Sequence, residues 1–222
     1  MTREEVWQCI LEVGIIPSVR ASSADLAVAA AKAVWEGGIP IIEVPMTVPG
    51  AIGVIEDLAS GARGEILVGA GTVLGAETAA RCLDAGAEFI ASPGFDSETV
   101  KLANLQDKLV MAGALTPTEI ITAWKAGSDF VKVFPCDNVG GPKYIRAVKA
   151  ALPQIPLVAA GEMDTETAAE FLCAGASALG VADELMMPEA LRTRDMEAIT
   201  EAARRYVAIV RAVRERQSER AA

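Results

Sequence analysis

The sequence alternates short apolar runs, rich in β-branched residues, with amphipathic helical segments along its whole length. Eight runs are candidate strands, at residues 15–19, 39–44, 66–68, 89–90, 109–111, 130–134, 157–159 and 178–181. Strands that alternate with helices predict βαβ units and a parallel sheet, and eight such units match an α/β fold of the (β/α)8 TIM-barrel type. In a barrel of this kind the active-site groups project from the carboxyl ends of the strands.

Helix start signals support the segments between the strands. Ser22 is expected to cap a helix over 26–36, which two glycines end. Thr116 and Asp164 are expected to cap two later helices, the first with a proline at its first helical position. A doubly wound open sheet is the main alternative, but it needs fewer strands and often has a glycine-rich dinucleotide turn after the first one, which this sequence lacks.

The two ends of the chain predict additional helices around a single domain. Residues 1–13 predict an extra N-terminal helix that caps the bottom of the barrel, and 196–222 predict a long final helix, to about residue 216, with a frayed tail. No linker-like segment divides the sequence, so residues 1–222 are expected to form one barrel domain.

The composition narrows the class of partner. The formal net charge is −10 and the sequence pI is about 4.6, so the field of the protein repels nucleic acid and anionic membrane surfaces. No apolar run reaches the roughly 18 residues that span a bilayer, and the acidic N-terminus is unlike a signal peptide. We therefore expect a cytoplasmic enzyme that acts on small molecules, without a nucleic-acid or membrane partner.

Histidine and cysteine usage excludes several mechanisms. The chain has no histidine, which removes imidazole bases, the usual serine and cysteine triads and histidine-bound zinc. The four cysteines lie far apart and are expected to be reduced, small core residues: Cys9, Cys82, Cys136 and Cys173. Acid–base chemistry must then fall to carboxylates, lysine, tyrosine or water.

Two charged residues interrupt strands that should be apolar on both faces. Strand alternation puts Glu43 on the opposite face from Ile42 and Val44, and it puts Lys132 on the opposite face from its two flanking valines. If these apolar neighbours pack on helices, both charges point into the barrel. Burial of an unpaired charge costs on the order of several kcal/mol, so the two residues form either an ion pair without a catalytic role or a catalytic pair.

Schiff-base chemistry accounts for a catalytic pair of this kind. A neutral lysine amine attacks a carbonyl, and the resulting iminium withdraws electrons from the adjacent bond. Burial among Phe130, Phe134 and the barrel wall favours the neutral amine. Glu43 is the only acidic residue within the expected strands. We therefore predict that Lys132 forms an imine with a 2-keto acid and that Glu43 moves the protons.

Six strings carry a resemblance to a known family. They are IEV (42–44), VGAGTV (68–73), SPG (92–94), LTPTE (115–119), VKVFP (131–135) and GGPKY (140–144). In this order and spacing they resemble the 2-keto-3-deoxy-6-phosphogluconate and 4-hydroxy-2-oxoglutarate aldolases, over nearly the whole chain. The resemblance implies a class I aldolase that reversibly cleaves a 2-keto-4-hydroxy acid to pyruvate and an aldehyde. It also implies a homotrimer that needs no metal or other cofactor.

The resemblance implies roles for particular residues. Lys132 would form the imine and Glu43 would transfer protons. Thr72 and the backbone of Gly71 would hold the pyruvate carboxylate. Arg20 would bind this carboxylate or orient the glutamate, and its alternative is an ordinary surface arginine.

Three further residues are implied to contact substrate. Thr47 stands where several family members carry a substrate-binding arginine and where another branch has threonine. Pro93 and Phe134 are similar to pocket walls of the family, and their alternative is an ordinary turn or core position.

The sequence departs from the family where the phosphate of a substrate is bound. Members commonly have Thr-Gly-Gly after the seventh strand and Gly-Ser after the eighth, which form a phosphate cup. This chain has Gly161 followed by Glu162, and it has Asp183 after the eighth strand. Carboxylates beside a phosphate are repulsive, so we expect an aldehyde that is unphosphorylated and either hydroxylated or cationic. The alternative is that these acids lie on a solvent-facing rim and leave the cup intact.

Two other function classes remain open from the sequence. One is a sugar-phosphate isomerase or epimerase that uses Glu43 as base and Lys132 as electrostatic stabiliser. The other is a non-catalytic barrel that serves as an assembly protein. The second is disfavoured because apolar replacements for a buried ion pair are often neutral or stabilising.

Overall fold

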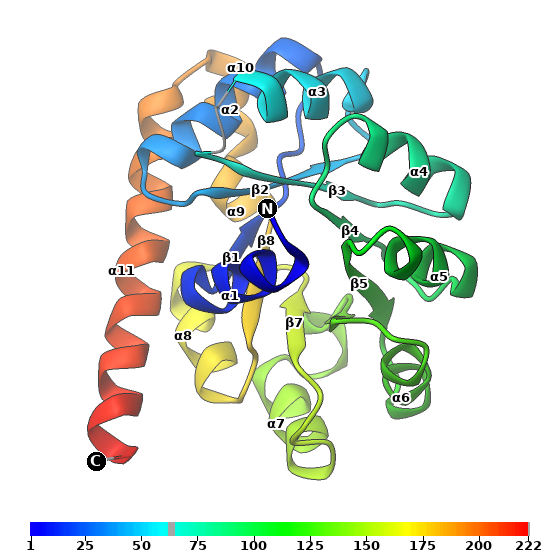
Figure 1. The fold of residues 1–222 in the computed structure, drawn as a ribbon. Coiled ribbons are helices and arrows are strands. Elements are labelled where there is room, and N and C mark those ends of the chain that lie inside the picture. Colours follow the sequence, from blue (N-terminus) through cyan, green and yellow to red (C-terminus); the bar gives the residue numbers. More distant parts are fainter. Residues whose placement is uncertain (62–64, 222) are drawn as a thin grey trace.

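A computed structural model describes residues 1–61 and 65–221 and has the predicted barrel architecture (Figure 1). Eight parallel strands lie in the order β1-β8-β7-β6-β5-β4-β3-β2. Their bounds are β1 Ile15–Pro17, β2 Ile41–Pro45, β3 Leu67–Gly71, β4 Phe89–Ala91, β5 Leu109–Ala114, β6 Phe130–Val133, β7 Leu157–Ala160 and β8 Ala178–Val181. The ring closes where the amide of Val19, just after β1, donates to the carbonyl of Glu43 in β2 over 2.9 Å.

Alternation along the strands sorts their side chains into two apolar layers. Ile41 and Phe130 join the cluster inside the barrel, together with Phe89. Ile42 and Val131 belong instead to the cluster between the strands and the surrounding helices. Glu43 shares a strand face with Ile41, and Lys132 shares one with Phe130. The predicted inward direction of both charged residues therefore holds.

Twelve helical segments surround or follow the strands in the described part of the chain. They are α1 Arg3–Val13, α2 Ala24–Glu36, α3 Ala51–Gly61, α4 Ala76–Asp84, α5 Ser97–Leu105, α6 Pro117–Lys125, the 3-10 turn η1 Asp137–Val139, α7 Pro142–Ala151, α8 Thr165–Cys173, α9 Asp183–Met186, α10 Pro188–Thr193 and α11 Met196–Ala221. Thr116 caps α6 in a full capping box, and Asp164 caps α8, both as predicted. The cap of α2 is Ser23, whose hydroxyl accepts from the amide of Leu26, and not Ser22.

Helix α1 lies across one end of the barrel, the end that faces the viewer in Figure 1. Its buried residues Val6 and Ile10 join the interior cluster, and Trp7 stacks on Phe130 with ring centroids 6.0 Å apart. Gly14 ends the helix with a left-handed φ of 71°, and its amide donates to Ile10. This helix therefore closes the amino-terminal end of the barrel, as predicted, and leaves the carboxyl ends of the strands for the site.

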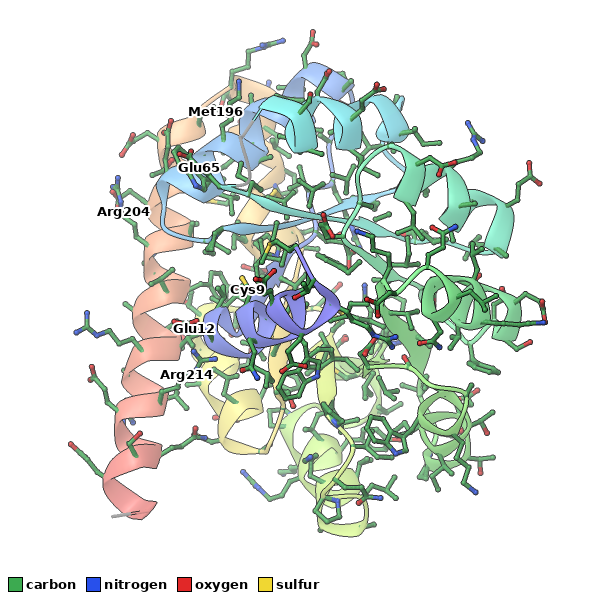
Figure 2. All side chains as sticks on the ribbon, in the orientation of Figure 1. Cys9, Glu12, Glu65, Met196, Arg204 and Arg214 are labelled. Atoms are coloured by element: carbon green, nitrogen blue, oxygen red, sulfur yellow. The ribbon has the colours of Figure 1, made fainter. Side chains whose placement is uncertain are left out.

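Helix α11 runs along one side of the barrel and ends away from it (Figure 1). The hydroxyl of its buried Thr200 donates to the carbonyl of Ala33 in α2. Arg214 reaches α1, where its guanidinium donates to the carbonyl of Leu11 (Figure 2). The helix continues to Ala221, beyond the expected end near residue 216, and fraying of its tail stays a prediction.

The cysteines agree only in part with their expected core positions. All four are free; Cys82 and Cys136 are buried, Cys9 is half-buried, and Cys173 is exposed at the end of α8. The prediction was wrong for Cys173 because its helix turns this residue toward solvent. Among the described residues, no helix is long and apolar enough to cross a membrane.

Candidate active site

Lys132 and Glu43 meet inside the barrel although they come from strands far apart in the ring. The lysine Nζ lies 3.1 Å from Oε2 and 3.4 Å from Oε1 of the glutamate. Their side chains are 13% and 5% exposed. Because β2 and β6 are separated by three strands on either side of the ring, only inward-pointing side chains could meet in this way. The two charges predicted from the strand pattern therefore form one buried pair.

The pair lies at the base of a cavity of about 520 Å³ at the carboxyl ends of the strands. The predicted site residues that line it are Arg20, Glu43, Thr72, Pro93, Lys132, Phe134, Gly161, Glu162 and Asp183. A large concave space with a few convergent polar groups is the usual form of a small-molecule site. The structure thus brings together side chains from most of the eight strand ends.

Thr72 lines this cavity with an unusual backbone conformation. It directly follows β3 and has a φ of 54°, in the left-handed region that a β-branched residue rarely adopts. Strained backbone of this kind clusters at functional sites, where the surrounding structure maintains it. The conformation supports the proposal that Thr72 has a role beyond packing.

Two of the predicted residues are outside the cavity lining. Thr47 is exposed in a turn closed by a hydrogen bond from the amide of Val48 to the carbonyl of Pro45. Gly71 is buried behind Glu43, and a Cβ built on it would lie 2.3 Å from Oε1 of the glutamate. Gly71 therefore makes room for the glutamate carboxylate.

Arg20 lies at the mouth of the cavity and pairs with Asp183 over 3.4 Å. No hydrogen bond or ion pair joins it to Glu43 within residues 1–61 and 65–221. Its side chain is 51% exposed, and the Asp183 side chain is 61% exposed. Arg20 is thus a mouth residue whose partner in this structure is Asp183, the first residue of α9.

Several lining residues were not predicted from the sequence. They are Ser18, Pro135, Asp137, Asn138, Ala160, Met163, Gly180, Ala182 and Glu184. Asp137 follows β6 by a few positions, and the rule that barrel sites form at strand carboxyl ends could have identified it. Cys136 is adjacent in sequence, but burial, followed by the charge of Asp137, raises the pKa of its thiol to about 12. It is therefore a packed thiol and not a second nucleophile.

The comparisons with known proteins agree with this geometry. A family model described as "KDPG and KHG aldolase" matches residues 6–202. The chain belongs to this family. The 2-dehydro-3-deoxy-6-phosphogalactonate aldolase of Escherichia coli (strain K12) is 31% identical over 210 residues, which cover 94% of this chain and 98% of the relative. The resemblance noted in the sequence is confirmed.

Two solved structures are similar over most of the chain. A KDPG aldolase from Legionella pneumophila, described as holding pyruvate captured as a covalent carbinolamine intermediate, has a TM-score of 0.83 at 25% identity, covering 89% of this chain and 96% of that one. A designed cube-shaped cage, described as made by fusing symmetric oligomeric domains, has a TM-score of 0.86 at 28% identity, covering 94% of this chain and 76% of that one. Both matches share the barrel fold.

Proposed function

We propose that this chain is a class I aldolase that reversibly cleaves a 2-keto-4-hydroxy acid to pyruvate and an aldehyde through an imine at Lys132. The observation that carries the proposal is the buried contact of 3.1 Å between Lys132 Nζ and Glu43 Oε2 at the base of the cavity. The family, and the relative that holds pyruvate as a carbinolamine, support the same chemistry. An isomerase or an assembly protein has no comparable support.

The reaction follows from the contact between the two side chains. Glu43 takes a proton from Lys132, and the neutral amine attacks C2 of the substrate to give a carbinolamine. Loss of water, with a proton supplied to the leaving hydroxyl, gives the iminium. The electrons of the C3–C4 bond then move toward the iminium nitrogen while the C4 hydroxyl loses its proton, which releases the aldehyde and leaves an enamine. Protonation at C3 and hydrolysis by water release pyruvate and restore the amine.

Glu43 is the proton carrier in each of these steps. Its carboxylate is within hydrogen-bond reach of the reacting nitrogen, as a general acid or base must be. The chain has no histidine that could compete for the task. Burial keeps bulk water from replacing Glu43 as the local acid or base.

The other lining residues position the substrate. Thr72 holds the pyruvate carboxylate beside the imine, and Pro93 and Phe134 form the walls around the reacting carbons. Gly71 lies outside the cavity lining and makes room for the Glu43 carboxylate. Arg20, at the mouth, exchanges its contact with Asp183 for a substrate oxygen. Thr47 reaches the substrate only if its turn moves.

We also propose that the enzyme is a cytoplasmic homotrimer. The similar domain used in a cage of fused symmetric oligomers supports self-association. Two apolar side chains on neighbouring loops, after β3 and β4, remain exposed in the single chain: Leu74 at 73% and Phe95 at 36%. Burial of apolar side chains of this kind is typical of contacts between subunits. Sedimentation of the full chain tests the oligomer.

Pyruvate release measures the proposed activity directly. The substrate is 2-keto-3-deoxygluconate or 4-hydroxy-2-oxoglutarate, and pyruvate is followed by its reduction with lactate dehydrogenase and NADH. We expect turnover by the wild type and a loss of at least about 1,000-fold in Lys132→Met, because the covalent route is removed. Equal turnover by wild type and Lys132→Met would overturn the proposal.

A further inference from the structure

Asp137 occupies the turn of the cavity at which an anionic substrate end would be expected to bind. Its Oδ1 accepts a hydrogen bond from the backbone amide of Glu162 over 3.2 Å. A Cβ built on Gly161 would lie 2.0 Å from the same oxygen, so the carboxylate rests against the bare backbone of the glycine. The amide of Cys136 donates to the carbonyl of Ala160 over 3.0 Å and holds the two loops together.

An internal carboxylate in this position competes with an external anion. Backbone amides in glycine-containing turns are common binding groups for phosphate and carboxylate. The Glu162 amide already has a negatively charged partner from the chain itself. A phosphate could bind at this turn only if the Asp137 carboxylate left, and it would then lie beside a displaced negative charge.

The remaining charges of the cavity also disfavour the binding of an anion. Arg20 and Lys132 are the cationic side chains among the described lining residues, and each is paired with a carboxylate. The other lining carboxylates are those of Asp137, Glu162 and Glu184, and no cation of the described residues lies within ion-pair distance of them. The part of the cavity lined by Asp137, Glu162 and Glu184 is therefore negative and rich in hydrogen-bond acceptors.

These carboxylates differ in exposure, and their charges should therefore act on a bound substrate with different strength. Glu162 and Glu184 are exposed at the mouth, where water and salt screen their charges. Asp137 is half-buried and fixed by the Glu162 amide and Gly161. Asp137 is consequently the carboxylate that a bound aldehyde meets in a defined position.

We propose that Asp137 is a specificity-determining residue, which selects an aldehyde whose far end donates hydrogen bonds from hydroxyl or ammonium groups and rejects one that ends in phosphate. A carboxylate accepts hydrogen bonds from both kinds of donor and has none to offer a phosphate oxygen. The inference rests on the proposed aldolase function, and it names the class of aldehyde that this site takes.

The test is aldol addition of pyruvate to three aldehydes by the full-length protein. The aldehydes are glyceraldehyde, an amino-substituted analogue of it, and glyceraldehyde 3-phosphate, and the readout is kcat/KM for each. We expect the wild type to prefer the hydroxylated or the amino aldehyde over the phosphate by at least about tenfold. A wild type that prefers the phosphate overturns the inference.

Asp137→Asn isolates the charge, because the amide oxygen still accepts from Glu162. We expect this variant to shift the ratio of kcat/KM values toward the phosphate by about tenfold, mainly through a lower KM for the phosphate. Glu166→Gln removes one exposed negative charge outside the cavity lining and should change the ratio less than about twofold. Equal shifts in the two variants contradict a role for Asp137.

A measurement on the wild type keeps the test independent of how the variants fold. Higher salt should leave most of the discrimination against the phosphate in place, because salt screens the exposed charges of Glu162 and Glu184 far more than the half-buried Asp137, and a preference that disappears at high salt contradicts the inference. Covalent trapping of pyruvate on the wild type separates the two proposals. Trapping with a preference for phosphate overturns the role of Asp137 alone, whereas failure to trap pyruvate overturns the aldolase proposal itself.

Discussion

Gly71 and Glu43 are in such close contact that a single added methyl group at Gly71 would lie 2.3 Å from the glutamate Oε1 and 2.7 Å from its Cγ. The two residues lie on neighbouring strands, where Glu43 is paired in register with Gly69 and the carboxylate extends toward the end of β3. The absence of a side chain on Gly71 is thus what allows the carboxylate to reach Lys132.

Gly71→Ala should displace the carboxylate from Lys132 and leave the fold in place. The group that must move is the far end of a flexible side chain, so we expect kcat to fall by about 100-fold, in the range of general acid–base contributions. The melting temperature should fall as well, because the separated charges of Glu43 and Lys132 stay buried. Gly53→Ala is the matched control, since nothing lies within 4 Å of its added Cβ. Full activity of Gly71→Ala would show that the position of Glu43 does not matter.

A double-mutant cycle should measure the interaction energy of the buried ion pair between Lys132 and Glu43. Lys132→Met leaves the Glu43 charge buried without its partner and should lower the free energy of unfolding by about 3 kcal/mol. Adding Glu43→Gln removes this charge and should restore most of the loss. Urea unfolding of the wild type, the two single variants and the double variant gives the coupling. Additive effects of the two substitutions would mean that the pair does not interact.

Gly69 makes room for a ring inside the barrel. A Cβ built on it would lie 2.2 Å from the ring of Phe89, a side chain with no exposed surface. Gly69→Ala should therefore overpack the interior and cost about 1–3 kcal/mol of stability. Adding Phe89→Leu should recover part of this cost, and the recovery is measured in the same unfolding experiments. If Phe89→Leu lowers the free energy of unfolding as much in Gly69→Ala as it does in the wild type, the contact between residue 69 and Phe89 does not cause the loss of stability.

The thiols should differ in reactivity with iodoacetamide at pH 8. Burial raises the pKa of the Cys82 thiol to about 11 and, with the charge of Asp137, that of the Cys136 thiol to about 12, and burial also raises the pKa of Cys9. A raised pKa keeps the thiol protonated and unreactive as pH rises toward these values. We expect Cys173 to be labelled first in the native protein and all four in urea. Peptide mass spectrometry gives the order, and early labelling of Cys136 would contradict it.

The barrel and the buried pair of Glu43 and Lys132 could be predicted from the sequence because both depend on local patterns. Eight apolar runs between helical segments identified the strands, and strand alternation gave the direction of Glu43 and Lys132. The cap of α2 was placed one residue early, since adjacent serines carry the same signal and only the backbone distinguishes Ser22 from Ser23.

The rest of the site depends on contacts between loops, which have no periodic signal in a sequence. The hydrogen bond from Glu162 to Asp137 joins the loop after β7 to η1, and the ion pair of Arg20 with Asp183 joins the loop after β1 to α9. Thr47 follows its strand as closely as the other predicted residues, but the turn that exposes it depends on one backbone hydrogen bond. Proximity to a strand end therefore predicts a place in the cavity lining correctly for most of the candidate residues and wrongly for Thr47.

The central claim is that the Lys132 amine captures the keto group of pyruvate, and borohydride reduction tests it most directly. The protein is incubated with pyruvate, reduced, and its intact mass and peptides are measured. We predict one reduced pyruvate adduct per chain, located on the peptide that contains Lys132, and no adduct in Lys132→Met. An adduct on another lysine, or an unmodified wild type under conditions in which it turns over substrate, would contradict the account.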